Sequence, residues 1–366
     1  MKYIKSTIYA LLFAAGSLHS SFAATVTIDG TIPGFVETSR ALPGYESQTL
    51  KPIVFEHIVL SQEAKDFLAQ DIKPAAKATL KANRTSLPTQ KFVGMNDVPV
   101  LDQGQHGSCV TFAVIGAIDA ATAELNHKTG ADTYSELCSL ELGSSLEKAS
   151  IYDLKTKSYA YPNGWDGSWG YLVLDQVKKY GLITTQYQKT DGCSNVFTYP
   201  ISVEEDRGNP IDAENYTKHS QKIMPPVSYK TLLNVDDAFS PRANMDDVLT
   251  KVKSALANGH RVTFGTLVDV NRGHNGALGT YKAPYDTWML TANIASDARN
   301  NQINAGHEMI IIGYDDNAEV GGHKGVLTLR NSWGDSPGVG DHGNYYMTYD
   351  HFTKLAMEAQ EIIPNG

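Results

Sequence analysis

The chain has 366 residues, of which 42% are hydrophobic and 19% are charged, so it can bury a sizeable core in more than one folding unit. Its formal net charge of −9 at pH 7 argues against a nucleic acid or an anionic membrane surface as a partner. The composition therefore indicates an ordinary globular protein that binds neither.

The first residues predict a secretory signal peptide, residues 1–23. Residues 1–5 are basic, residues 8–16 are apolar, and Ser21-Phe22-Ala23 places small residues before a cleavage site. The apolar stretch is far shorter than the roughly 20 residues that span a bilayer, and no later segment is long and apolar enough either. We therefore expect a secreted or periplasmic protein that is cut near Ala23.

The next region, residues 24–90, predicts a β-hairpin followed by a helix. Residues 25–30 alternate between polar and apolar and end in an Asp-Gly turn dipeptide, and residues 51–60 are a second strand candidate. Ser61 is the expected N-cap of a helix with one apolar face, which Pro74 ends or kinks.

The segment 102–112, DQGQHGSCVTF, places Cys109 immediately before an apolar, helix-compatible run. A cysteine at a helix N-terminus meets unpaired backbone N–H groups and the positive end of the helix dipole, so its thiolate becomes accessible near neutral pH. The alternative is a small buried cysteine that packs as a hydrophobe.

Two later segments supply what a nucleophilic cysteine needs, namely a base and a group that orients the base. His307 stands just ahead of an apolar, strand-like run, and a second strand ends in Asn331-Ser332-Trp333-Gly334. With these motifs the chain resembles the papain-like cysteine peptidases. The resemblance implies an α+β fold with two domains, in which an active-site cleft separates an α-helical half from a β-barrel-like half.

The resemblance implies a role for each matching residue. Cys109 is the nucleophile, His307 is its proton partner, and Asn331 holds the imidazole ring in place. Gln103 donates to the developing oxyanion, and Trp333 shields the Asn331–His307 hydrogen bond from water. Substrate-binding positions implied in the same way are Asp166, Gly167, Trp169, Ala305 and Gly306.

The sequence also departs from the familiar members of the family. Val110 follows the cysteine where those members have an aromatic residue, and His106 stands where they have a disulfide cysteine. The chain between Cys109 and His307 is longer than in the family, which predicts insertions near residues 191–232 and 270–304.

The two halves of the region 91–366, the expected peptidase domain, are visible as patterns. Residues 170–181 predict a helix that ends at a glycine, and residues 261–268 alternate as a strand. If Cys109 stays free in an exported chain, Cys138 and Cys193 are left as a disulfide pair. The alternative is two independent buried thiols.

Papain-like enzymes are usually made as zymogens, so residues 24–90 resemble a propeptide that inhibits the enzyme in cis. Residues 80–91 are a polar linker where cleavage can occur, and we expect the inhibitory interface to loosen in acid. The alternative is a permanent N-terminal subdomain.

The sequence therefore predicts an exported cysteine endopeptidase, made as an autoinhibited zymogen, that acts on protein or peptide substrates. We expect a monomer with no cofactor and no metal. One alternative is an acyl-transfer enzyme with the same triad, such as a deamidase or a transglutaminase-like enzyme. Another is a papain-fold binding protein that has lost catalysis.

Overall fold

The structure is a computed structural model. It describes residues 25–42, 45–70, 87–126, 133–149, 152–153, 158–159, 163–224, 226–273 and 275–365. The predicted signal peptide and residues 80–86 of the predicted linker lie outside these ranges.

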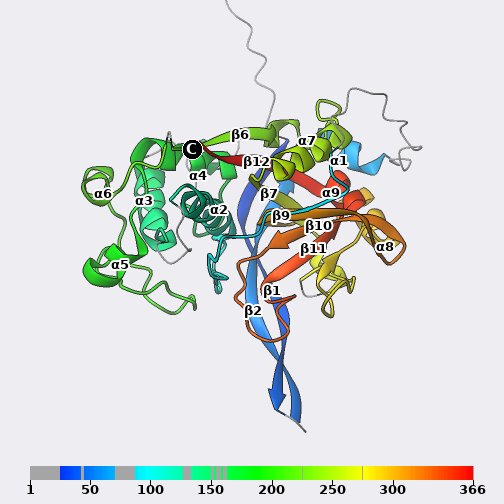
Figure 1. Cartoon of the computed structure of the whole chain (residues 1–366), viewed down its shortest axis with the longest axis horizontal. Coiled ribbons are helices and arrows are strands. Elements are labelled where there is room, and N and C mark those ends of the chain that lie inside the picture. The colour runs from blue at the N-terminus through cyan, green and yellow to red at the C-terminus, as the bar shows by residue number, and fades with distance from the viewer. Residues whose placement is uncertain are drawn as a thin grey trace, which may run out of the picture.

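The α+β class predicted from the sequence is confirmed. A helix-rich part lies at one side of the molecule and a large sheet at the other (Figure 1). The helix-rich part contains α2 (Cys109–Leu125), α3 (Glu136–Ala149), α4 (Gly170–Tyr180), α5 (Thr185–Asp191) and α6 (Ala213–His219), with the short pair β4 (Tyr152–Asp153) and β5 (Ser158–Tyr159).

The main path of the sheet runs in the order β6-β12-β7-β9-β10-β11-β8. Its neighbours are antiparallel except β11 and β8, which are parallel. The strands are β6 (Val227–Leu233), β7 (Arg261–Val268), β8 (Thr287–Trp288), β9 (Ala305–Val320), β10 (His323–Arg330), β11 (Asn344–Thr348) and β12 (Ala356–Pro364). Three helices lie around the sheet: α7 (Met245–Ala257), α8 (Ala292–Arg299) and α9 (Tyr349–Leu355).

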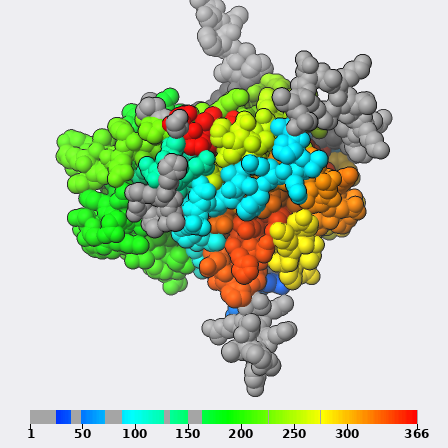
Figure 2. Space-filling view, in the orientation of Figure 1, coloured from blue at the N-terminus to red at the C-terminus, as the bar shows by residue number. Residues whose placement is uncertain are grey.

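Helix α2 packs against β9 and β12 and joins the two parts of the molecule. It is apolar on nearly all sides, as expected for a helix buried in a core. Gly116 allows close packing, because a Cβ there would lie 3.3 Å from Cδ1 of Ile310 on β9. Figure 2 shows the segment that leads into α2, in cyan, on the surface between the green helical part and the orange strands.

The N-terminal region forms one long hairpin from β1 (Val26–Leu42) and β2 (Tyr45–Leu60), which projects beyond the sheet (Figure 1). The Asp-Gly dipeptide predicted to end the first strand is instead an irregularity inside β1, where the register shifts between Ile28 and Thr31. Gly30 has a φ of 83°, which a glycine adopts at low cost in a bulge.

Strand β2 pairs with β9 through Glu56 opposite Gly306 and His57 opposite Ala305. Helix α1 (Gln62–Ala69) follows, and its predicted N-cap is confirmed, because Ser61 Oγ accepts a hydrogen bond from the Ala64 N–H at 3.2 Å. The hairpin is therefore joined to the sheet by backbone hydrogen bonds. The short strand β3 (Gln90–Phe92) also pairs with β9.

The two regions predicted as loop-like insertions contain regular structure. The first holds α6 and most of β6, so its interpretation as a polar loop was wrong; Asp212 caps α6, which turns a polar, proline-rich stretch into a short helix. The second holds β8 and α8, and it contributes β8 to the edge of the sheet.

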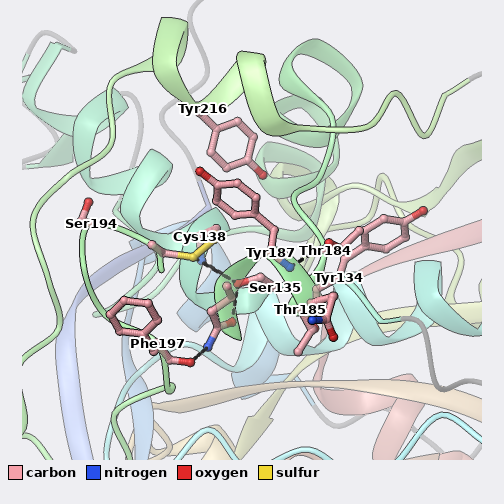
Figure 3. The surroundings of a disulfide bond; sticks show 12 residues. Tyr134, Ser135, Cys138, Thr184, Thr185, Tyr187, Ser194, Phe197 and Tyr216 are labelled. Atoms are coloured by element: carbon pink, nitrogen blue, oxygen red, sulfur yellow. Dashed lines mark hydrogen bonds between the residues drawn. A yellow bond between two sulfur atoms is a disulfide. The ribbon is translucent and has the colours of Figure 1, made fainter. Parts of the chain in front are cut away.

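Cys138 and Cys193 form a disulfide with their Cα atoms 5.2 Å apart, as the sequence predicted. The bond ties α3 to the segment that follows α5. Figure 3 shows Cys138 among Ser135, Tyr187 and Tyr216, and Ser135 Oγ accepts the Cys138 N–H at 2.9 Å. Within the described ranges, no helix is both long enough and apolar enough to cross a membrane.

Candidate active site

Cys109 is the first residue of α2, and its side chain is fully buried. Its sulfur receives a hydrogen bond from the backbone of Glu308, the residue after His307. The start of α2 and the start of β9 therefore meet at this thiol, although they are far apart in the sequence. The preceding residue, Ser108, does not cap the helix but shares a hydrogen bond of 2.9 Å with the Tyr199 hydroxyl.

His307 and Asn331 are joined by a hydrogen bond of 2.8 Å between His307 Nε2 and Asn331 Oδ1. The ring of Trp333 stacks on the imidazole at 4.7 Å with an interplanar angle of 19°, and it is buried. His307 Nδ1 has no hydrogen-bond partner among the described residues. The arrangement fixes the ring through one nitrogen and leaves the other nitrogen available for proton transfer.

Gln103 is fully buried just before α2, and its side chain is held at both ends. Its Nε2 donates to the His106 carbonyl at 2.9 Å, and its Oε1 accepts from Ser332 Oγ at 2.8 Å. The Gln103 N–H also donates to the Ser332 carbonyl at 2.8 Å. These bonds connect the loop before Cys109 to the loop that carries Asn331.

The N-terminal hairpin covers this site. A Cβ on Gly167 would lie 2.7 Å from Ile28 of β1, and one on Gly107 would lie 2.8 Å from Thr31, so both loops need glycine to admit the hairpin. Phe55 of β2 meets His307 edge-on, with ring centroids 5.7 Å apart. The thiol and the imidazole are therefore closed off from solvent.

Two further contacts hold β2 in place. Lys51 Nζ pairs with Asp102 Oδ2 at 2.5 Å and donates to the Trp333 carbonyl at 2.6 Å. Glu56 Oε1 accepts the Ser168 N–H at 3.0 Å, and the Glu56 carboxyl also hydrogen-bonds the Cys109 side chain. The hairpin thus contacts Asp102, which precedes Cys109 in the sequence, and Ser168, which follows it.

Burial changes the protonation of the pair. It raises the pKa of the Cys109 thiol well above its ordinary value, and the nearby Glu56 charge acts in the same direction. Burial also lowers the pKa of His307 to about 4. The expectation of an accessible thiolate at the helix N-terminus is therefore wrong while the hairpin is docked. The hairpin removes the water that would stabilise the Cys109 thiolate or the His307 imidazolium.

The positions expected to bind substrate lie along the surface that the hairpin covers. Ala305 and Gly306 pair with β2, and Gly167 approaches Ile28 and Glu56. Trp169 packs in an apolar cluster with Ile58. Asp166 is more exposed, and its carboxylate lies 3.9 Å from Arg207.

The sequence analysis missed three buried carboxyl groups: those of Glu56 and Glu308, which act on the Cys109 thiol, and that of Glu358, which acts on both of them. Burial is the main reason that the pKa of Glu56 rises to about 8 and that of Glu358 to about 7. Burial also raises the pKa of Glu308 well above its ordinary value. A glutamate inside the apolar run that follows His307 was the available signal for one of them.

A comparison with protein-family models found no match, and no curated protein matches in sequence. Among solved structures the chain is similar to xylellain, a cysteine protease from Xylella fastidiosa, with 18% identity, a TM-score of 0.48 and coverage of 77% of this chain and 88% of that chain. It is also similar to digestive procathepsin L 3 of Tenebrio molitor larval midgut, with 17% identity, a TM-score of 0.44 and coverage of 81% and 78%. The function proposed below rests on the geometry of the site itself.

Proposed function

We propose that the protein is a papain-like cysteine endopeptidase that hydrolyses peptide bonds through Cys109, His307 and Asn331. The observation that carries the proposal is the His307–Asn331 hydrogen bond of 2.8 Å under the stacked ring of Trp333, next to a cysteine at a helix N-terminus. This combination supports nucleophilic catalysis, because it supplies a nucleophile, a base and a group that orients the base.

In the proposed reaction, His307 Nδ1 takes the proton of the Cys109 thiol, and the sulfur attacks the carbonyl carbon of the scissile bond. The oxyanion that forms accepts hydrogen bonds from Gln103 Nε2 and the Cys109 N–H. His307 then gives its proton to the leaving amine, and the C–N bond breaks. A water molecule hydrolyses the thioester and restores the thiol.

We further propose that the hairpin is the inhibitory part of a propeptide within residues 24–90. Burial of Cys109 and the contacts of Phe55, Lys51 and Glu56 support this, since a peptide substrate cannot reach the sulfur while β2 is paired with β9. The hairpin also favours the neutral thiol and imidazole over the reactive ion pair. The enzyme then becomes active when the hairpin leaves.

We also propose that the protein is secreted or periplasmic. The signal-peptide pattern of residues 1–23 supports this, and so does the Cys138–Cys193 disulfide, because such bonds persist in oxidising compartments.

The test compares wild-type protein with Cys109→Ala, using an epoxysuccinyl inhibitor and a fluorogenic peptide. The wild type, once cleaved between α1 and β3 and separated from its N-terminal fragment, should gain the inhibitor's mass on Cys109 and hydrolyse the peptide. Cys109→Ala should do neither, while its circular dichroism stays unchanged. Hydrolysis at the wild-type rate by Cys109→Ala would refute the proposal.

A second variant separates the roles within the site. Asn331→Ala should reduce turnover less than Cys109→Ala does, because Asn331 orients the imidazole and does not itself react. A labelled amine added to the reaction tests the alternative. If the acyl group is transferred to this amine in preference to water, the protein is instead an acyl-transfer enzyme.

A further inference from the structure

Glu308 follows His307 in β9, and its side chain points to the other face of the strand. His307 faces Asn331 and Trp333, whereas the Glu308 carboxyl faces Gly265, Gly170 and Glu358. Glu308 is 1% exposed, and its carboxyl lies against the Thr263 hydroxyl, but among the described residues neither carboxyl oxygen makes a hydrogen bond of good geometry. The nearby Thr263 hydroxyl donates its proton to Gln360 Oε1. A buried carboxyl without a partner is costly, so it needs an explanation.

The other two carboxyl groups of the cluster are satisfied. Glu358 accepts the Gly170 N–H at 2.9 Å, at the N-terminus of α4, and Gln360 Nε2 at 2.7 Å. Glu56 is bonded to Ser168 and Cys109. Their charges act on Glu308 with the same sign and oppose its ionisation. Within the described part of the chain the cluster therefore has no positive partner, and Glu308 is the member with unused acceptors.

Two glycines let the Glu308 carboxyl lie close to the backbone. A Cβ on Gly265 would lie 2.8 Å from Glu308 Oε2, and a Cβ on Gly170 would lie 3.3 Å from Glu308 Oε1. Any side chain at either position would press on the carboxyl. The carboxyl is also adjacent to the proposed chemistry, because the backbone of Glu308 bonds the sulfur of Cys109.

A metal ion does not fit this position. In the part of the chain that the structure describes, no group of three or more His, Cys, Asp or Glu side chains is arranged to hold one. A lysine or arginine side chain suits it better, because it needs one or two carboxylates and brings its own hydrogen-bond donors. Among the described residues of the hairpin, Glu56 is the one whose charge acts on Glu308, so we look for the positive partner in a molecule that replaces the hairpin.

We propose that Glu308 determines substrate specificity by binding a lysine or arginine side chain of the peptide substrate in a subsite beside Cys109. The proposal rests on the peptidase function proposed above. Once the hairpin has left, water and the substrate reach Glu308, which ionises and forms a charge-assisted hydrogen bond with the basic group. Glu358 adds a second negative charge on the α4 side of the subsite.

The test measures the specificity of the full chain after it has been activated by limited proteolysis. A positional-scanning set of fluorogenic peptides gives kcat/KM for arginine, lysine, leucine and glutamate at each position within three residues of the scissile bond. The ratio of kcat/KM for the arginine peptide to kcat/KM for the leucine peptide, measured on one preparation, does not depend on the fraction of active enzyme. It should be at least about tenfold at one position, as close charge pairs contribute about 1.5 kcal/mol or more.

The matched variants are Glu308→Gln and Glu319→Gln. The first keeps the size of the side chain and removes its charge, and the ratio should fall to near one. The second removes an exposed carboxylate from the far end of β9 and should leave the ratio unchanged.

The outcomes separate this inference from the function on which it rests. A wild-type enzyme that cleaves peptides but prefers leucine to arginine at every position overturns the inference alone, even if Glu308→Gln fails to fold. A basic preference that Glu358→Gln abolishes and Glu308→Gln retains overturns the assignment to Glu308. Cleavage of no peptide by protein whose Cys109 reacts with the inhibitor overturns the peptidase function as well.

Discussion

The carboxyl of Glu56, on the N-terminal hairpin, is hydrogen-bonded to the side chain of Cys109. An acid from the covering segment thus lies directly against the proposed nucleophile. It is buried together with Glu308 of β9 and Glu358 of β12, both of which carry the same charge when ionised. The pH of the solution should therefore control how firmly the hairpin is held.

The first prediction is that the hairpin loosens as the pH rises. Burial raises the pKa of Glu56 from 4.5 to about 8 in the docked hairpin, so the docked state holds a proton that a released hairpin loses. The contribution of Glu56 to docking is fully present below about pH 4.5 and is lost as the pH rises towards 8. This is the reverse of the acid loosening expected from the sequence, because the carboxyl that faces Cys109 is buried among other acids.

The measurement is hydrogen exchange of residues 26–60, relative to strand β7, between pH 5 and pH 9. The wild type should lose protection in the hairpin as the pH rises, and Glu56→Gln, which cannot ionise, should keep it. Glu37→Gln removes an exposed carboxylate from the same hairpin and should behave like the wild type. The same loss of protection in Glu56→Gln and in the wild type would contradict the prediction.

The second prediction concerns Lys51, which bonds both Asp102 and the Trp333 carbonyl. Hydrogen bonds that involve a charged group contribute about 1.5–3 kcal/mol, so Lys51→Ala should weaken docking by about tenfold or more. Uncleaved Lys51→Ala protein should hydrolyse a fluorogenic peptide faster than uncleaved wild type. Lys65→Ala, on α1, is the control, and equal rates for all three proteins would exclude this role of Lys51.

The third prediction concerns Gln103. Its side chain is fixed by His106 and Ser332, so its Nε2 is already oriented before a substrate arrives. Gln103→Ala should lower kcat by roughly 10²–10³ with little change in KM, as expected for loss of an oxyanion donor. Gln105→Ala, two residues further on, should leave kcat unchanged. A rise in KM at constant kcat would indicate that Gln103 binds the substrate instead.

The fourth prediction concerns the disulfide. Thiol counting on denatured, unreduced protein should give one free sulfhydryl, that of Cys109. Replacement of both Cys138 and Cys193 by serine should lower the free energy of unfolding by about 4 kcal/mol in the chain-entropy model, because the bond spans 55 residues. Urea unfolding measures this change. Three free sulfhydryls would show that the bond does not form.

Site residues that belong to short, contiguous sequence motifs could be predicted from the sequence. The residues around Cys109, His307 and Asn331 stand in short, specific patterns, and the structure brings Asn331 and His307 into contact. The helix at 170–181 and the strand at 261–268 were also confirmed, because periodicity and a terminal glycine are local signals.

What depends on pairing between distant segments could not be predicted. The Asp-Gly dipeptide is typical of a turn, and only the partner strand shows that it is a bulge at Gly30. The role of Glu56 follows from the pairing of β2 with β9, which the sequence of β2 alone does not specify. Glu308 likewise appears as one polar residue in an apolar run until Gly170 and Gly265 are placed around it.

Because β2 is paired with β9, cleavage of the chain and dissociation of the hairpin are two separate steps. If the chain is cut between α1 and β3, the fragment that carries β1, β2 and α1 keeps its strand pairing, its ion pair at Lys51 and its apolar contacts. The cut turns a tethered inhibitor into a free one. The concentration of inhibitor at the active site, which the tether had fixed, then equals the concentration of the fragment in solution. Freshly cut enzyme should therefore gain activity on dilution and lose it again on concentration, until the fragment itself is degraded.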